Sequence, residues 1–520
     1  MIGRHTWLTT LALLSVALLA PLLITDVPPI LDYPNHLARL VLLTAGPEDP
    51  VLGRIFMPHW SVIPNLVVDV VGPILLHLLP VHTAGRCLLA GILLLNLAGV
   101  LALHYAFFQR LSFWPLASGL CAYNSTFLLG FLNWQIGSGL AMLFAAGWLT
   151  WRDRKPVATV LGAVAASIVL FFCHLMGLVF FLVLISSAEM HAIRDRRTLL
   201  FRAAGLLPVV TGPTLLSLMT SIRDAPIATQ WMSLHNKLVQ VASPFINYVL
   251  CLDMATAVLL YGGVLLGIVA GWFKIASRAV LAVVVLTISY PVLPFDLMSA
   301  SFLDTRVAVM LGFLLFAAVD PVRLSSRAFR GIALGCTVLF AIRMAVLAEV
   351  WAEHRRDLAE LREVIAGVPS GAIVYVANVP QEEAPAYWDA GPRSRRLSNT
   401  LRADYHLPAL LLIERGAFWP VLFANPAQQP IRLRPAYAKL AQQAHDIDIP
   451  SHADLVADPG QGKSALRDFD FVLMLEAGAD PALADFVPKC LTLLSGTDFA
   501  ALFRVQRDSA ACAADPAPSG

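Results

Sequence analysis

The sequence is poor in charged residues. Asp, Glu, Lys and Arg make up only 14% of the 520 residues, whereas hydrophobic residues make up 58%. Soluble domains carry about 25% charged residues, so these few charges cannot cover a globule of this size. The composition therefore excludes an ordinary soluble protein and indicates an integral membrane protein.

Several chemical signatures are also missing. The net charge is only +2 and no basic tract suggests a nucleic-acid partner. The cysteines include no pair at the spacing of a metal site or redox motif. Cys490 and Cys512 both lie late in the chain and could form a disulfide if that part is extracytoplasmic. A Gly-rich phosphate loop, a His-Glu-x-x-His motif and a nucleophile elbow are absent. We therefore expect no cofactor; a divalent metal is compatible with the sequence but not indicated by it.

Hydrophobic runs of membrane-spanning length recur along the first 350 residues. A helix needs about 20 apolar residues to cross the hydrocarbon core, and about eleven segments approach this length. The first lacks a good cleavage site around Ala20, so we interpret it as an uncleaved span. The predicted spans are 7–25, 84–107, 112–130, 133–151, 156–172, 175–192, 199–219, 254–273, 279–295, 305–320 and 330–350.

Basic residues orient these spans. The clusters are 152–155, 194–202, 274–278 and 323–330. An even number of crossings separates each cluster from the next, so the positive-inside rule places all of them in the cytoplasm. The apolar segment Leu66–Leu79 is short and contains Asp69, and we interpret it as a juxtamembrane helix. The N-terminus is then cytoplasmic, while the loop 26–83 and the chain after 350 are outside.

One stretch of the outer loop concentrates reactive groups. Asp32-Tyr33-Pro34-Asn35-His36-Leu37-Ala38-Arg39 places a carboxylate, an imidazole and a guanidinium within eight residues. The prolines around it end the first span, and a short surface helix over 36–44 would follow. Asp32 is either a turn or N-cap carboxylate or a reactive group, and His36 is either a ligand-binding residue or an interfacial one.

Two other polar groups lie at predicted outer mouths of the bundle. His174 sits between two spans, where it either reaches a phosphate or is an ordinary interfacial turn residue. Arg306 lies in the first turn of a span, where the helix dipole already favours anions. An external anion would explain a cation there, and an ion pair with Asp304 is the alternative. Asp304 itself is suited to capping that helix.

The composition changes after residue 350. Residues 351–366 have the pattern of an exposed amphipathic helix, and 372–377, 469–475 and 495–505 read as strands. We therefore predict a soluble periplasmic α/β domain over 351–510. An Ala/Pro/Ser-rich tail, 511–520, is predicted to be disordered.

The Asp32-Tyr33-Pro34-Asn35-His36 stretch and its setting resemble the GT-C superfamily of membrane glycosyltransferases. An acidic residue in a long first outer loop, about eleven spans, surface helices in that loop and an outer C-terminal domain are all typical of the superfamily. Many members carry two adjacent acidic residues here, whereas Tyr33 follows Asp32 in this chain. The resemblance covers 1–350. It implies a polytopic α-helical, GT-C-like membrane module followed by an extracytoplasmic α/β domain.

The resemblance also implies a reaction. A sugar would pass from a polyprenyl-phosphate donor in the bacterial inner membrane to an envelope glycan, lipid or protein acceptor on the periplasmic face. Asp32 would take the proton of the acceptor hydroxyl as general base. Cations would stabilise the leaving phosphate. The candidates for binding the donor phosphate are His36, Arg39, His174, Arg306 and Asp304.

Two other function classes are compatible with a many-span chain. A transporter or flippase of lipid-linked saccharides would place charged residues at mid-membrane depth, and charges are rare inside these spans. A non-catalytic envelope assembly protein would use its outer domain to bind partners. Replacing Asp32 by Asn separates these classes, because only an enzyme depends on that carboxylate.

Overall fold

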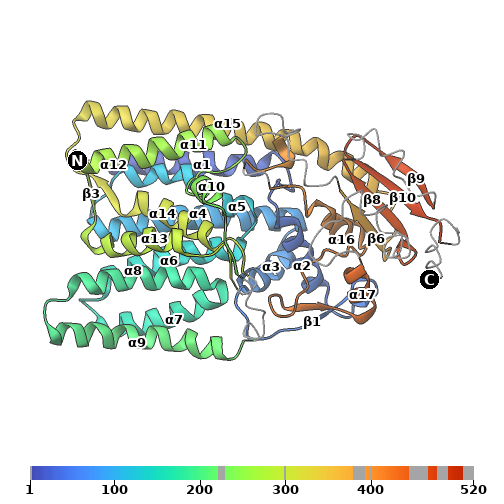
Figure 1. Cartoon of the computed structure of the whole chain (residues 1–520), viewed down its shortest axis with the longest axis horizontal. Helices are drawn as coiled ribbons and strands as arrows, with labels where there is room; N and C mark the ends of the chain where they lie inside the picture. Colours follow the sequence, from blue (N-terminus) through green and yellow to red (C-terminus); the bar gives the residue numbers. More distant parts are fainter. Residues whose placement is uncertain are drawn as a thin grey trace.

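The computed structural model shows a long helical bundle with a smaller mixed α/β region at one end (Figure 1). The residues that it describes are 3–220, 229–297, 300–378, 393–398, 401–443, 466–476 and 490–507. The predicted tail 511–520 and Cys512 of the predicted disulfide lie outside these ranges, so both remain predictions.

Apolar helices build the bundle. They are α1 (Arg4–Leu19), α4 (Val81–Phe108), α6 (Leu132–Trp151), α7 (Pro156–Cys173), α8 (Leu175–Ala192), α9 (Arg196–Leu218), α11 (Leu250–Ala257), α12 (Gly263–Val269), α13 (Val280–Val292), α14 (Leu303–Ala317) and α15 (Ser326–Ile365). Within the described ranges, seven helical stretches are long and apolar enough to cross a membrane. Large apolar side chains such as Leu207 and Val269 are exposed on the bundle, as expected for a surface that faces lipid. The chain is a multi-pass membrane protein.

The predicted span 112–130 is not one continuous helix. It consists of a 3-10 segment, Trp114–Cys121, and the single-turn helix α5 (Ser125–Leu128). Asn124 lies between the two with an extended backbone, and its side chain caps α5 by accepting a hydrogen bond from the backbone N–H of Phe127. Asparagine favours this N-cap role over a helix interior.

Two helices of the first loop lie at the end of the bundle that carries the α/β region, while the N-terminus and β3 (Phe273–Ile275) lie at the other end (Figure 1). They are α2 (Tyr33–Ala45) and α3 (Val67–Leu78). The 12 residues of α3 extend only about 18 Å, against the roughly 30 Å of a hydrocarbon core. This length agrees with a juxtamembrane helix over Leu66–Leu79.

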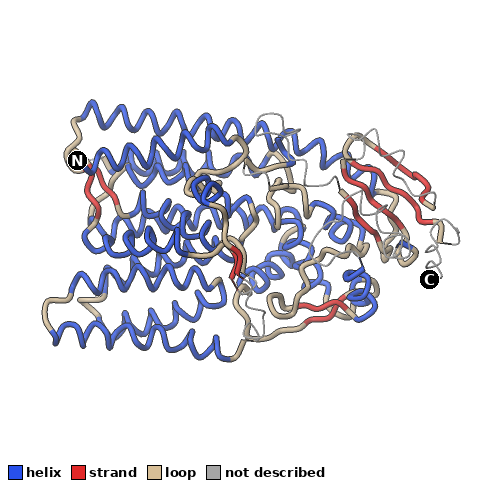
Figure 2. The backbone as a smooth tube through the Cα atoms, in the orientation of Figure 1, coloured by secondary structure: helices blue, strands red, loops and turns tan. Residues whose placement is uncertain are grey.

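A four-stranded sheet forms the core of the C-terminal region (Figure 2). Its order is β6 (Val374–Ala377), β8 (Phe471–Leu475), β10 (Ala500–Val505) and β9 (Leu491–Gly496). Strand β6 runs parallel to β8, and the other neighbours are antiparallel. Three of these strands overlap the predicted ones, and β9 was not separately predicted.

The helix predicted over 351–366 is not a separate exposed element. It is the last part of α15, a helix of 40 residues that runs through position 350 without a break. Trp351, Leu358 and Leu361 are buried, and α15 contacts β10. The hydrophobic face of this segment is therefore buried, with Trp351 against Tyr123 and Tyr248 and the later part of the helix against the sheet.

The first loop and the C-terminal region are joined directly. Strand β1 (Phe56–Pro58) pairs antiparallel with β7 (Ile431–Leu433). Asn35 donates to the carbonyl of Val421 and accepts from the backbone N–H of Phe423, both at 2.8 Å. The remaining short elements are β2 (Thr229–Gln230), α10 (Leu234–Gln240), β4 (Asp296–Leu297), β5 (Val319–Pro321), α16 (Leu410–Arg415) and α17 (Pro435–Gln443).

Candidate active site

A cavity of about 720 Å³ lies where the first loop, the bundle and the C-terminal region meet. It brings together most of the predicted site residues. Those that line it are Asp32, His36, Arg39, His174 and Arg306. Asp304 is not in its lining. The opposite wall comes from 420–442, a segment in which the sequence alone indicated no site residue.

Asp32 occupies the N-cap position of α2, but its side chain makes no capping hydrogen bond. Its backbone N–H donates to the carbonyl of Leu129 at 3.1 Å, which fixes the residue against the turn before α6. Gly130 in that turn has φ +82°, and a Cβ atom there would lie 2.8 Å from the Cβ of Asp32. The backbone of Asp32 is therefore fixed against this turn, and its side chain lines the cavity.

His406 is the close polar neighbour of this carboxylate. Its Nδ1 lies 3.2 Å from Oδ1 of Asp32. Phe423 contacts the rings of both His406 and His36, with centroid distances of 4.9 and 5.7 Å. No local pattern in the sequence singles out His406, because it reaches Asp32 only through the docking of the C-terminal region on the first loop.

Arg306 does not pair with Asp304. Asp304 is fully buried and accepts from Nζ of Lys237 at 3.1 Å. Arg306 donates from Nη1 to the carbonyl of Ser301 at 2.5 Å and lies over the ring of Phe131, with 4.7 Å from its Cζ to the ring centroid. Within the described ranges it forms no ion pair, and its buried Nε has no hydrogen-bond partner. A cation left unneutralised at a helix N-terminus and facing a cavity is well suited to bind an anion.

Arg39 has different partners from Arg306. Its Nε and Nη2 donate to the two carboxylate oxygens of Asp69 at 2.6 and 3.2 Å. Its Nη2 also lies 2.9 Å from Nδ1 of His36. Arginine can only donate, so this Nδ1 accepts and the hydrogen of the neutral ring is on Nε2. The charge of Arg39 is thus compensated within the cavity wall, and Asp69 is a partner that sequence reasoning missed.

The environment keeps His36 neutral. Burial, followed by the positive charge of Arg39 and the proximity of His406, lowers its pKa well below the usual value, and the backbone of Gly130 only partly opposes this. A neutral imidazole donates a single hydrogen bond, from Nε2 in this case. This Nε2–H is directed to the backbone of Gly130, so the binding of a donor phosphate by His36 stays a prediction.

His174 lies in the turn between α7 and α8 and caps α8. Its Nδ1 accepts from the backbone N–H of Met176 at 3.0 Å, and its ring packs against Trp134 with centroids 5.8 Å apart. Burial, and then the charge of Arg306, lowers the pKa of His174 well below its usual value. His174 is therefore a turn residue that also lies on the cavity wall, and its binding of a phosphate stays a prediction.

Uncharged polar groups complete the lining. Asn133 accepts from the backbone N–H of Val68 and donates to the carbonyl of Asn65. Asn425, Gln428 and Gln429 lie on the C-terminal wall, beside the charged Arg432. Amide groups of this kind suit a ligand rich in hydroxyl groups. Among the described residues there is no group of three or more His, Cys, Asp or Glu side chains that could hold a metal ion.

No family model and no curated protein sequence matches the chain. Solved structures do match it. ArnT from Cupriavidus metallidurans, a GT-C aminoarabinose transferase crystallised with undecaprenyl phosphate, superposes with a TM-score of 0.55 at 12% identity, over 99% of this chain and 100% of ArnT. The apo form of ArnT gives 0.54 at 12% identity, over 95% and 97% of the two chains.

The chain has the GT-C fold. The match includes the C-terminal region as well as the bundle, because it covers nearly all of both chains. The resemblance inferred from residues 1–350 is thereby confirmed at the level of the fold and extends further than those residues. In this chain, the acidic residue of the first loop and the cation of α14 line the same cavity.

Proposed function

We propose that the protein is a glycosyltransferase that moves a sugar from a polyprenyl-phosphate donor to an acceptor hydroxyl. The observation that carries this proposal is the placement of the Asp32 carboxylate and the unpaired Arg306 guanidinium in one cavity at the end of a membrane bundle. A base and an anion-binding cation are the two groups that such a transfer needs. The acceptor is an envelope glycan, lipid or protein.

Each residue of the site has its own role in the proposed reaction. Asp32 takes the proton of the acceptor hydroxyl while that oxygen forms a bond to the anomeric carbon of the sugar. The bond from this carbon to the phosphate oxygen breaks on the opposite side, and its electron pair remains on the polyprenyl phosphate. Arg306 stabilises the growing negative charge, and Nε2–H of His174 donates a hydrogen bond to the same phosphate.

The membrane supplies the donor. The lipid tail of a polyprenyl phosphate stays in the bilayer, so a cavity at the end of the spans is reached without a nucleotide-binding motif. The undecaprenyl phosphate bound to ArnT supports this class of donor. We place the cavity and the α/β region on the periplasmic side of a bacterial inner membrane, because the N-terminus and the basic connections lie at the opposite end of the bundle.

The reaction is tested with the full-length protein in liposomes that contain polyprenyl-phosphate sugars of different headgroups. We expect release of polyprenyl phosphate from at least one donor, and we expect Asp32→Asn to abolish it. Glu48→Gln is the matched control, since Glu48 is an exposed carboxylate of the same loop. Full activity of the Asp32→Asn protein would overturn the proposal.

The membrane side is tested separately. A single cysteine placed at Pro50, in the first loop, is expected to react with an impermeant thiol reagent in intact spheroplasts. Reaction only after lysis would contradict the periplasmic placement of the cavity.

A further inference from the structure

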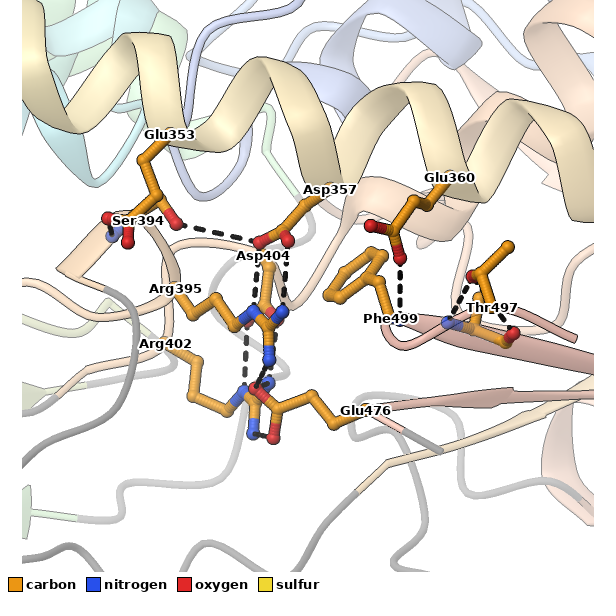
Figure 3. Close-up of polar contacts among 11 residues, drawn as sticks. Glu353, Asp357, Glu360, Ser394, Arg395, Arg402, Asp404, Glu476, Thr497 and Phe499 are labelled. Carbon is orange, nitrogen blue, oxygen red and sulfur yellow. Dashed lines mark hydrogen bonds and ion pairs between the residues drawn. The ribbon is translucent and has the colours of Figure 1, made fainter. Parts of the chain in front are cut away.

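An ion-pair network links α15 to the segment that carries His406 (Figure 3). Asp357 of α15 binds Arg395, and Arg395 reaches Glu476 beyond the end of β8. Arg402 then binds both Glu476 and Asp404. The N···O distances are 2.8 Å for Arg395–Asp357, 3.4 Å for Arg395–Glu476, 2.8 Å for Arg402–Glu476 and 2.6 Å for Arg402–Asp404.

This network is buried where it meets the site. The side chains of Arg402 and Asp404 are only 2% and 1% exposed, so neither charge can be compensated by water. The backbone N–H of Leu407 donates to the carbonyl of Asp404 at 2.9 Å. The turn from Asp404 to Leu407 is thus fixed at its start by an ion pair and closed by a hydrogen bond. His406 lies inside that turn.

Aromatic rings hold the imidazole of His406 from several sides. Its centroid lies 4.9 Å from that of Phe423, 5.3 Å from that of Tyr405 and 5.9 Å from that of Trp419. Its buried Nδ1 has no hydrogen-bond partner among the described residues, and the polar atom it approaches is Oδ1 of Asp32 at 3.2 Å. A buried donor is rarely left without an acceptor, and catalytic hydrogen bonds are often long before substrates bind.

We propose that His406 is a positioning residue for Asp32. In this arrangement, which rests on the proposed function, Nδ1–H donates to Oδ1 and fixes the carboxylate plane. Oδ2 is then left to take the proton of the acceptor hydroxyl. The C-terminal region therefore completes the site. The ion-pair network from Asp357 through Arg402 to Asp404 sets the position of His406 and hence of its Nδ1–H donor.

The test measures kcat and KM for the donor in three variants. Asn places its amide nitrogen near the position of Nδ1, whereas Gln places it near Nε2 and Leu has no donor. We expect His406→Leu and His406→Gln to lose about tenfold to a hundredfold in kcat, the range for a hydrogen bond to a charged group. KM should change little, and His406→Asn should recover most of kcat.

His82→Leu is the matched control. His82 also pairs with a carboxylate, Glu414, at 2.9 Å, but neither residue lines the cavity, so we expect an unchanged kcat. Thermal unfolding identifies any variant that fails to fold. If the Leu protein does not fold, the comparison of Asn with Gln decides, and equal kcat values for these two would overturn the positioning role.

The two proposals fail in different ways. If Asp32→Asn is inactive and all His406 variants keep the wild-type kcat, the inference about His406 is overturned and the glycosyltransferase remains. If Asp32→Asn itself is fully active, the proposed function is lost first, and with it the reason for a residue that positions Asp32.

Discussion

Two pairs of an aspartate and an arginine lie in this molecule in contrasting states. Asp253 and Arg343 form a closed pair inside the bundle, with Nη1 and Oδ1 2.8 Å apart. Asp253 also accepts from Ser398 and from the backbone of Asn247. Asp32 and Arg306 line a shared cavity without forming an ion pair. The closed pair, Asp253 and Arg343, has its hydrogen bonds satisfied within the protein and stabilises the structure. We call Asp32 and Arg306 an open pair, because their side chains keep hydrogen-bonding atoms available for a ligand.

Arg39 and Asp69 show that position on the cavity alone does not decide the role. Both lie beside the site, yet they are bound to each other at 2.6 Å and are almost completely buried. Sequence reasoning grouped Arg39 with Arg306 as a phosphate-binding cation. The structure separates them, because one has a carboxylate partner and the other has none among the described residues.

The largest expected effect comes from exchanging the two aspartates for asparagine. We expect Asp32→Asn to lower kcat by about 10²–10⁴-fold with little change in the melting temperature, because it removes the base. We expect Asp253→Asn to destabilise the protein by about 3–5 kcal/mol, because Arg343 is left buried without its counter-charge. Donor turnover and thermal unfolding measure the two. Equal destabilisation by both would break the distinction between open and closed pairs.

Substitutions of the two arginines should differ in the same way, with Arg306 affecting activity and Arg343 affecting stability. Arg306→Met should reduce kcat by about 10²–10³-fold, the range for one donor to a developing oxyanion, while the protein stays folded. Arg306→Lys should recover part of this loss, since it restores the charge but not the planar donor group. Arg343→Met should instead lower the yield of folded protein, measured by size-exclusion chromatography. An active Arg306→Met enzyme would remove this cation from the site.

Gly130 sharpens the comparison at the backbone level. Ala at this position is strained at φ +82° and its Cβ would press on Asp32, so we expect kcat to fall by about tenfold to a hundredfold through misplacement of the base. Gly162→Ala is the control, because nothing lies within 4 Å of a Cβ there and Ala favours a helix. Similar kcat values for the two variants would show that the turn does not position Asp32.

The smallest effect concerns the closed pair on the cavity wall. In a double-mutant cycle of Arg39→Gln and Asp69→Asn, we expect a coupling free energy of unfolding of about 0.5–3 kcal/mol. We also expect the double variant to keep more activity than either single variant, because no unpaired charge remains. Additive effects on unfolding would contradict a structural role for this pair.

Part of this arrangement is predictable from sequence because it is local. Asp32 and His36 lie within one stretch after the first span, and the helix that follows is apparent from its prolines and apolar residues. Arg306 stands out because a cation at a helix N-terminus is unfavourable without an anion. Composition and basic clusters likewise predict the spans, although Asn124 interrupts one of them.

The remainder depends on contacts between distant parts of the chain. His406 and Phe423 reach the site only because Asn35 binds the backbone of 421–423 and β1 pairs with β7. Asp69 pairs with Arg39 from a neighbouring helix. The hydrophobic pattern within a single segment contains no information about such distant partners. The sequence therefore predicts the membrane half of the site and misses the C-terminal half.

The length of α15 sets a mechanical condition on the whole protein. Its 40 residues form a rod of about 60 Å, and a helix cannot shorten without losing backbone hydrogen bonds. One end carries Arg327 and Arg330. The other end carries Asp357, which pairs with Arg395, and Glu360, which accepts from the backbone N–H of Phe499 just before β10. Because the helix continues without a break from the membrane span into the C-terminal region, a tilt of its membrane part also displaces Asp357 and the residues paired with it.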